Sequence, residues 1–242
     1  MRDKVIVIVG PTGSGKTGLA IDLALRAQGE VISADSRAIY RGMDIGTAKP
    51  TQEEMRGVRH WGLDLVEPGE RFTVADFKEY ALGAIEDIRA RGRLPIIAGG
   101  TGLYVDAIVY DYQFNDIVKK TYSDRQEMGS DYLIIGIKWD RGELRMRLVE
   151  RLNTIFAQGI VGETKALVAK YGWGSQAMKS NIYPIVRRMV EGEIDGAEAK
   201  RLAALCDWHL AKRQTTWFAR NKNIKWMGLD EAKEYLYNIN NE

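Results

Sequence analysis

The chain opens on the stretch Val5-Ile6-Val7-Ile8-Val9-Gly10-Pro11-Thr12-Gly13-Ser14-Gly15-Lys16-Thr17, in which an apolar run leads directly into a glycine-rich octet. The run is typical of a buried strand, and residues 10–17 fit the phosphate-binding loop pattern at every fixed position. Glycines let a backbone wrap closely around an anion, and the loop amides and the following helix N-terminus supply a positive field. We expect Lys16 to reach the outer phosphate oxygens and the Thr17 hydroxyl to hold Mg²⁺. This stretch therefore predicts a site for a di- or triphosphate.

Short apolar runs then alternate with helical patterns through the first half of the chain. This order is typical of an α/β fold with a parallel sheet covered by helices, and the loop makes the fold P-loop NTPase-like. We expect strands at residues 5–9, 31–34, 63–66, 94–98, 132–137 and 224–227. We expect helices at residues 17–27, from 73, from about 103, from 140 to 158, and at 161–171, 176–191 and 196–221, with capping residues Thr73, Asp140 and Asp195.

Polar residues follow two of the predicted strands. Asp35-Ser36 comes after the second strand, and Gly100-Thr101 comes after the strand at 94–98. Ligands of open α/β sheets bind outside the carboxyl ends of the strands, so we expect these residues beside the phosphate loop. The strand at 94–98 ends in Gly-Gly-Thr without the acid that motor and switch ATPases use for magnesium. A small-molecule kinase fits this pattern, and so does a transferase that grips a leaving diphosphate.

Composition restricts the class of protein further. The 242 residues, 45% hydrophobic and 28% charged, suit one α/β domain with a small appendage. The single cysteine, Cys206, excludes an internal disulfide framework and fits a reducing compartment. The N-terminus lacks the long apolar core of a signal peptide, and no run reaches membrane-spanning length. These features predict a cytoplasmic protein without a membrane partner.

The charge distribution is uneven although the net charge is only +2. Residues 165–225 hold twelve Lys or Arg against five Asp or Glu. Such a block is either a solvated helical face or the footprint of a nucleic acid, and charge alone leaves both open.

Four segments together resemble the tRNA dimethylallyltransferase family. They are residues 10–17, 32–50, 99–104 and 211–218. The most specific of them contains Asp35-Ser36 followed by Tyr40-Arg41-Gly42-Met43-Asp44-Ile45-Gly46-Thr47-Ala48-Lys49-Pro50. The last, Ala211-Lys212-Arg213-Gln214-Thr215-Thr216-Trp217-Phe218, is similar to the C-terminal signature of the family. With the C-terminal helices, the resemblance covers most of the chain.

The resemblance implies an enzyme that moves a five-carbon allylic group from dimethylallyl diphosphate to the exocyclic amine of an adenosine beside the tRNA anticodon. Asp35 would be the base that accepts the amine proton, because the amine is a poor nucleophile. Thr101 would lie beside the amine or the leaving oxygen. Lys16, the loop amides and Mg²⁺ on Thr17 would stabilise the departing diphosphate.

The resemblance also implies two groups of tRNA-binding residues. The segment that touches the target base is Asp35, Ser36, Arg37 and Ala38. The basic C-terminal helix would hold the phosphates of the loop with Trp208, Lys212, Arg213, Gln214, Trp217 and Arg220. The expected partners are the tRNA anticodon arm and dimethylallyl diphosphate.

Two departures from the family pattern stand out. Family members carry a helical insertion of several dozen residues, with an Asn-Asp…Arg element, where this chain has only the short segment 111–130. The Gly-Tyr-Arg element of the family aligns with Ile182-Tyr183-Pro184, so a proline replaces the arginine expected near the diphosphate. Arg187 or Arg188, one turn later, could substitute for it.

The sequence accordingly predicts a compact, monomeric member of this family. Its parts are the first part of the core at residues 1–110, a truncated insertion at 111–130, and the rest of the core with the basic helices at 131–242. Three alternatives stay open: an isopentenyltransferase acting on free adenosine phosphates, a small-molecule P-loop kinase, and an RNA-binding protein that retains the fold with weakened catalysis.

Overall fold

A computed structural model describes residues 4–114, 127–179 and 182–239 of the chain. Within these ranges six strands form one parallel sheet in the order β3-β2-β4-β1-β5-β6. The strands are β1 (Val5–Val9), β2 (Gly29–Ser33), β3 (His60–Trp61), β4 (Leu94–Gly99), β5 (Tyr132–Ile137) and β6 (Lys225–Met227). The predicted α/β class and its P-loop NTPase-like sheet are confirmed.

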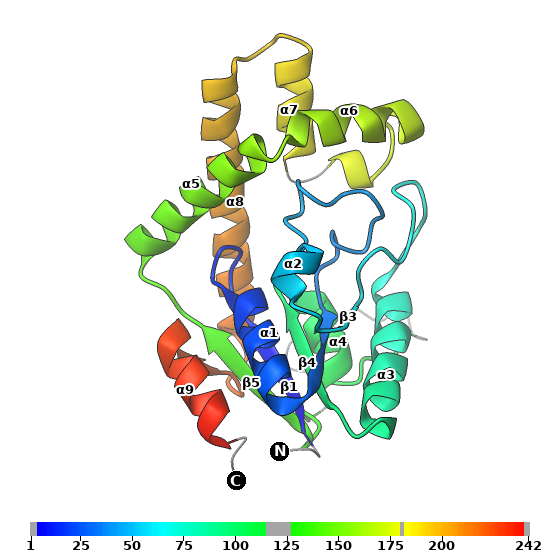
Figure 1. The fold of residues 1–242 in the computed structure, drawn as a ribbon, viewed down its shortest axis with the longest axis vertical. Coiled ribbons are helices and arrows are strands. Elements are labelled where there is room, and N and C mark those ends of the chain that lie inside the picture. Colours follow the sequence, from blue (N-terminus) through cyan, green and yellow to red (C-terminus); the bar gives the residue numbers. More distant parts are fainter. Residues whose placement is uncertain (1–3, 115–126, 180–181, 240–242) are drawn as a thin grey trace.

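Helices cover both faces of the sheet because its central strands are apolar on both sides (Figure 1). Ile6 and Ile8 of β1 pack with α1 (Lys16–Ala27) and α9 (Leu229–Ile239). Val5, Val7 and Val9 face the other way, toward α3 (Val74–Ala90) and α4 (Gly102–Val109). The alternation of strand side chains thus places two separate apolar layers around one sheet.

The remaining helices extend beyond the sheet, at the end where β1 leads into the phosphate loop (Figure 1). They are α5 (Arg141–Ala157), α6 (Ile160–Tyr171), the short 3₁₀ helix η2 (Ala177–Lys179), α7 (Tyr183–Val190) and α8 (Gly196–Phe218). The predicted stripe of Leu144, Leu148, Leu152 and Ile155 is buried. A third apolar cluster joins α5, α6, α7 and α8 to the segment around Met43. These helices therefore form a wall over the carboxyl edge of the sheet.

The predicted capping residues have the predicted role. Thr73 and Asp76 form both halves of a capping box at the start of α3. Asp140 accepts from the amides of Gly142 and Glu143, and Asp195 accepts from that of Glu198. The helix starts could therefore be predicted from short-range polar chemistry.

Two predicted elements differ from the structure. The third strand is His60–Trp61 rather than 63–66, because Gly62 and Asp64 adopt positive φ and turn the chain away. The predicted helix at 176–191 is η2 and α7 instead, and Pro184 lies in the first turn of α7, a position that proline favours. Helix α9 was not predicted, although Ala232 and Leu236 have helical spacing and are buried.

The short helix α2 (Gln52–Met55), opened by Thr51, was not predicted either. Most of the predicted truncated insertion, residues 115–126, lies outside the described residues, so the division of the chain at 111–130 stays a prediction. Within the described ranges, no helix is both long and apolar enough to cross a membrane.

Candidate active site

Three segments with polar side chains meet at the carboxyl edge of the sheet. The phosphate loop follows β1, Asp35 follows β2, and Thr101 follows β4, whose neighbours are β1 and β2. Because all three strands run in the same direction, their carboxyl ends lie side by side. The structure therefore brings together the residues that the sequence proposes for phosphate binding and for catalysis.

The phosphate loop has the backbone conformation that its glycines permit. Gly13 and Gly15 have φ values of 77° and 84°, in the region that other residues rarely adopt. Gly15 is the N-cap of α1, so the loop ends at a helix N-terminus. Outside contacts fix the loop: the Trp139 indole N–H donates to the Ser14 carbonyl at 3.0 Å, and Arg147 Nε donates to the Gly13 carbonyl at 2.8 Å.

Lys16 lies at the centre of the site. Its Nζ donates to the Pro11 carbonyl at 2.9 Å. Burial lowers the pKa of Lys16 to about 8; Arg151 also lowers it, whereas the Asp35 carboxylate acts in the opposite direction. An anion bound at the loop would further favour the charged form of this lysine. Thr17, in the first turn of α1, has an exposed side chain beside the same space.

Hydrogen bonds fix the Asp35 carboxylate within its own turn and join the neighbouring Ser36 to Thr101. Asp35 Oδ1 accepts from the Arg37 amide at 2.8 Å, which fixes the carboxylate in a short turn. Thr101 Oγ1 accepts from the Ser36 amide at 3.0 Å and donates to Ser36 Oγ at 3.2 Å. Thr101 occupies the N-cap position of α4 but makes no side-chain cap bond there. Its hydroxyl is thus used to join the β2 and β4 loops rather than to cap a helix.

Two neighbouring cavities share a wall at these residues. The loop cavity, of about 360 Å³, is lined by the phosphate loop, Thr17 and residues 147–154 of helix α5. The α8 cavity, of about 440 Å³, contains Ser36, Arg37, Thr101 and one face of α8. Both are lined by Thr12, Lys16, Asp35, Thr47 and Arg151. Two ligands could therefore approach Lys16 and Asp35 from different sides.

Helix α5 supplies two arginines to the loop cavity that the sequence analysis missed. Arg147 and Arg151 both line this cavity, one helical turn apart. Arg151 forms a partly buried ion pair with Asp207 of α8, and burial raises the pKa of Asp207 although Arg151 opposes the shift. The available signal was the helical spacing of the two arginines, which places them on one face of α5 beside its predicted apolar stripe.

Arg187 and Arg188 do not take the place of the arginine lost at Pro184. Arg187 pairs with Glu191 and stacks on Trp173, and Arg188 pairs with Glu193. Neither Arg187 nor Arg188 is among the described residues that line the two cavities. Both arginines are instead engaged on α7, which lies beyond the end of the sheet (Figure 1). Arg147 and Arg151 are the arginines at the loop.

The predicted tRNA-binding residues of α8 fall into different environments. Lys212, Arg213 and Arg220 are exposed. Arg213 lines the α8 cavity, and Lys212 lines a separate groove with Trp139, Trp208 and Trp226. In contrast, the Trp217 indole packs against the core and donates to the buried Asp106 carboxylate at 2.7 Å.

Gln214 is also engaged within the protein. It bonds the backbone of the phosphate loop and of the Gly100 loop. The geometry therefore does not favour RNA contacts for Trp217 or Gln214. Ala38, predicted to touch the target base, is buried, although it lines the loop cavity.

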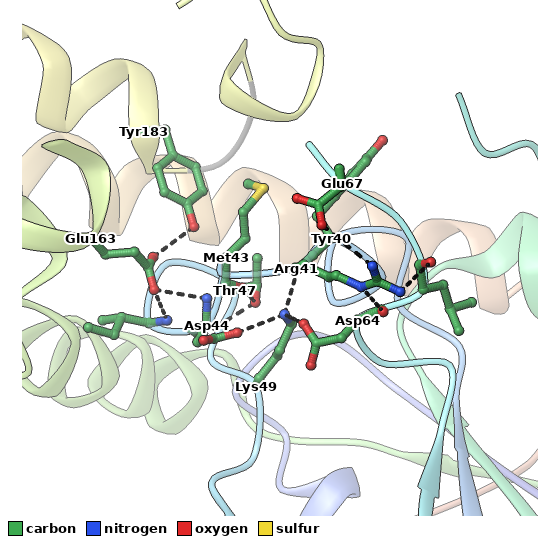
Figure 2. A network of polar contacts seen from close by, with 12 residues as sticks. Tyr40, Arg41, Met43, Asp44, Thr47, Lys49, Asp64, Glu67, Glu163 and Tyr183 are labelled. Carbon is green, nitrogen blue, oxygen red and sulfur yellow. Dashed lines mark hydrogen bonds and ion pairs between the residues drawn. The ribbon is translucent and has the colours of Figure 1, made fainter. Parts of the chain in front are cut away.

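The signature segment at residues 40–49 is held by polar contacts within the protein (Figure 2). The Glu163 carboxylate accepts from the amides of Asp44, Ile45 and Gly46 at 2.8, 2.6 and 2.9 Å, and from the Tyr183 hydroxyl at 2.8 Å. Lys49 Nζ donates to the Tyr40 carbonyl and to two carboxylates, at 2.5–2.7 Å. This segment is a rigid wall that carries Thr47 to both cavities.

A phosphate loop, two arginines and a carboxylate beside a second cavity define a site for transfer of a group from a phosphorylated donor to an acceptor. A family model described as IPP transferase matches residues 38–130 and 114–222. The chain belongs to this IPP transferase family.

Relatives match over nearly the whole chain. A tRNA dimethylallyltransferase of Acetivibrio thermocellus is 36% identical over 95% of this chain and 93% of its own length. That of Geobacillus thermodenitrificans is 33% identical over 99% of this chain and 95% of its own length. The first alignment is 290 positions long and this chain has 242 residues, so at least 48 positions hold no residue here. The two family-model matches overlap at residues 114–130. This overlap falls within the segment that the sequence analysis predicts to be a reduced insertion.

Solved structures agree with these matches. A full-length tRNA isopentenylpyrophosphate transferase of Bacillus halodurans is 30% identical, with a TM-score of 0.88 over 98% of this chain and 95% of that one. A eukaryotic dimethylallyltransferase acting on tRNA has a TM-score of 0.82 at 21% identity, which shows the fold alone.

Proposed function

We propose that this protein transfers a dimethylallyl group from dimethylallyl diphosphate to the exocyclic amine of an adenosine beside the tRNA anticodon. The observation that carries the proposal is the shared wall of the two cavities, in which Lys16 and Asp35 lie together. A diphosphate on the loop and an adenine in the α8 cavity would meet at this wall. The relatives that match nearly the full chain are named tRNA dimethylallyltransferases. Their names favour tRNA over a free nucleotide as the acceptor, and prenyl transfer over a kinase reaction.

The reaction requires one bond to form and one to break. The adenine nitrogen bonds to the allylic carbon, the carbon–oxygen bond to diphosphate breaks, and the amine loses a proton. Asp35 lies where a base is needed, and its Oδ1 is already oriented by the Arg37 amide. Thr101, which Ser36 holds in place, lines the α8 cavity and would lie beside the amine or the leaving oxygen. The proton thus passes from nitrogen to the Asp35 carboxylate.

The departing diphosphate gains negative charge, and the loop cavity offers positive groups to stabilise it. These are the backbone amides of Gly13, Gly15 and Lys16, the Lys16 side chain, and the guanidinium groups of Arg147 and Arg151. Because Lys16 has a pKa of about 8, a bound anion raises its charged fraction where charge is needed. The two arginines of α5 supply the positive charge that Pro184 cannot.

Magnesium fits this donor set. Mg²⁺ binds through one or two protein oxygens together with substrate phosphates and waters. The exposed Thr17 hydroxyl beside the loop is such an oxygen, and Thr17 would hold the ion with the diphosphate. When bound, the ion neutralises charge on the leaving group.

For tRNA we propose a surface at the mouth of the α8 cavity. Asp35, Ser36 and Arg37 line the cavity into which the unstacked base would insert, and buried Ala38 supports them from the adjoining wall. Arg213, Lys212 and Arg220 of the C-terminal part of α8 and the turn after it are exposed for phosphate contacts. A cytoplasmic location and a monomeric state stay predictions.

The test supplies purified protein with radiolabelled dimethylallyl diphosphate, Mg²⁺, and one of two acceptors: unmodified tRNA or AMP. We expect label in tRNA and none in AMP. Label in AMP alone would assign the protein to the enzymes that act on free adenosine phosphates. Turnover of ATP without transfer of label would indicate a kinase and contradict the proposal.

A further inference from the structure

Gln214 joins the two halves of the site through a single side chain. Its Oε1 accepts from the Thr12 amide of the phosphate loop at 2.7 Å. Its Nε2 donates to the Gly100 carbonyl at 3.1 Å. Gln214 is 202 residues from the first partner and 114 from the second. A carboxamide is suited to this bridge because it offers one acceptor and one donor side by side.

Both partners of Gln214 belong to the proposed machinery. Thr12 lines both cavities, and the Gly100 carbonyl directly precedes Thr101, which holds the Ser36 amide. A continuous chain of bonds thus runs from the phosphate loop through Gln214 and Thr101 to the segment that bears Asp35.

Gln214 projects from a firmly packed part of α8. Ala211 and Phe218 on either side of it are buried, and Trp217 is bonded to Asp106. The other side of the bridge is equally tight, since a Cβ on Gly100 would lie 2.3 Å from Gln214 Nε2. Only a glycine at position 100 allows this approach. The bridge therefore has a rigid support at each end.

We propose that Gln214 is a positioning residue that holds the phosphate loop and the Asp35–Thr101 pair at their reactive separation. This inference rests on the proposed function. It assigns Gln214 an effect on the rate of transfer at saturating donor and tRNA, and little effect on the affinity for tRNA.

The principal test measures single-turnover transfer at saturating donor and tRNA for Gln214→Met, which keeps the length and loses both hydrogen bonds. We expect the rate to fall roughly 10²-fold, the loss that a small misplacement of reacting groups produces. The dissociation constant for tRNA should change less than about threefold, since no phosphate contact is removed. A normal rate with weaker tRNA binding would make Gln214 an RNA contact and overturn the proposal.

Gln214→Glu tests the bridge through the pH dependence of the transfer rate, which a merely structural role of Gln214 would not change. An ionised Glu still accepts from Thr12 but repels the Gly100 carbonyl, whereas a protonated Glu can donate to it. The rate relative to the wild-type protein should therefore rise as the pH falls from about 6 to about 4, across the ordinary pKa of a glutamate carboxyl, about 4.3. A ratio that does not vary with pH would contradict the bridge.

Gly100→Ala breaks the same bridge from the other side, because the new methyl group displaces the flexible end of Gln214. We expect Gly100→Ala combined with Gln214→Met to be no slower than the slower single variant, as for residues that act through one contact. Additive losses would show that the two residues act separately. Gln158→Met and Gln158→Glu make the same chemical changes at an exposed position and should leave the rate unchanged.

Amide exchange separates failure of this inference from failure of the proposed function. Exchange at the Thr12 amide should accelerate more than about tenfold in Gln214→Met and much less in Gln214→Glu, which keeps the acceptor. This holds whatever the wild-type protein catalyses. An unchanged rate of exchange at the Thr12 amide in Gln214→Met would overturn the bridge. Absence of dimethylallyl transfer by the wild-type protein would instead overturn the proposed function.

Discussion

The phosphate loop and the signature segment at residues 40–49 are both recognisable in the sequence, but they differ in what their polar groups do. In the loop, the Lys16 amine makes one backbone hydrogen bond and lies beside a cavity. In the signature segment, the Lys49 side chain is 5% exposed and has three oxygen partners (Figure 2). The loop is built to receive a ligand, whereas the signature segment is built to hold its own shape.

This difference shows that the motif more specific to the family, the signature segment, need not be the one that supplies the reactive groups. Glu163 is bonded to three consecutive amides of the signature segment and to Tyr183. Burial and the Glu163 carboxylate raise the pKa of Tyr183, which stays a donor at neutral pH. The segment contributes Thr47 to the wall of both cavities, and Lys49, bound by its three oxygen partners, to the wall of the loop cavity.

The largest effect is expected at Lys16. Lys16→Met removes a positive group aimed at the leaving diphosphate, and we expect kcat/KM for transfer to fall roughly 10³-fold, about 4 kcal/mol in the transition state. Steady-state transfer to tRNA measures it. Lys49→Met should instead lower the midpoint of denaturation, and a loss of kcat/KM as large as that of Lys16→Met would erase the contrast between the two segments.

The pH dependence of donor binding sharpens the same contrast. Free Lys16 has a pKa of about 8, lowered by burial, so it is mostly charged below that pH and mostly neutral above it. A bound diphosphate favours the charged form, so donor affinity should decline as pH rises through about 8, with uptake of a proton on binding. Calorimetry in buffers of different ionisation enthalpy measures both. Lys16→Arg, which stays charged, should abolish the decline; a decline that persists would place the titrating group elsewhere.

The next largest effect is expected at Glu163, on stability. Glu163→Ala leaves three amides and the Tyr183 hydroxyl without their acceptor, so we expect a loss of about 2–4 kcal/mol in the free energy of unfolding. Urea denaturation measures it. Glu234→Ala, at an exposed position of α9, should cost less than about 0.5 kcal/mol. Equal midpoints for the two variants would mean that the signature segment is held by other contacts.

The smallest effect is expected on the RNA surface. Lys212→Ala with Arg213→Ala should weaken tRNA binding and reduce the slope of log K against log salt by about 1.5, because each phosphate contact releases counterions. Filter binding over a salt series measures it. Lys4→Ala with Arg93→Ala removes two cations before β1 and β4, at the opposite edge of the sheet, and should leave the slope unchanged. A slope that is reduced only by Lys4→Ala with Arg93→Ala would place the RNA-binding surface at the opposite edge of the sheet.

Much of the fold could be predicted because its chemistry is local. The central strands are apolar runs, and Thr73, Asp140 and Asp195 cap helices within three residues of themselves. The two-residue strand β3 could not be found this way, since positive φ at Gly62 and Asp64 displaced the chain. The sequence also predicted that Lys16, Asp35 and Thr101 lie close together, because each follows a strand and parallel strands end at the same edge of the sheet.

The rest of the site depends on contacts between distant segments. Nothing near Gln214 in the sequence indicates that it bonds Thr12, and its place in a basic helix suggested RNA. Arg151 reaches the loop cavity only because α5 lies across the edge of the sheet. Such roles are set by packing and have no periodic or local pattern.

The most direct measurement of the central claim is single-turnover transfer of the dimethylallyl group to tRNA by Asp35→Asn. This change keeps the shape of the side chain and removes the proton acceptor at the shared wall. We predict a rate at least about 10³-fold below that of the wild-type protein, with tRNA and donor affinities within about threefold. Transfer within a few-fold of the wild-type rate would contradict the account, because Asp35 would then not be the base.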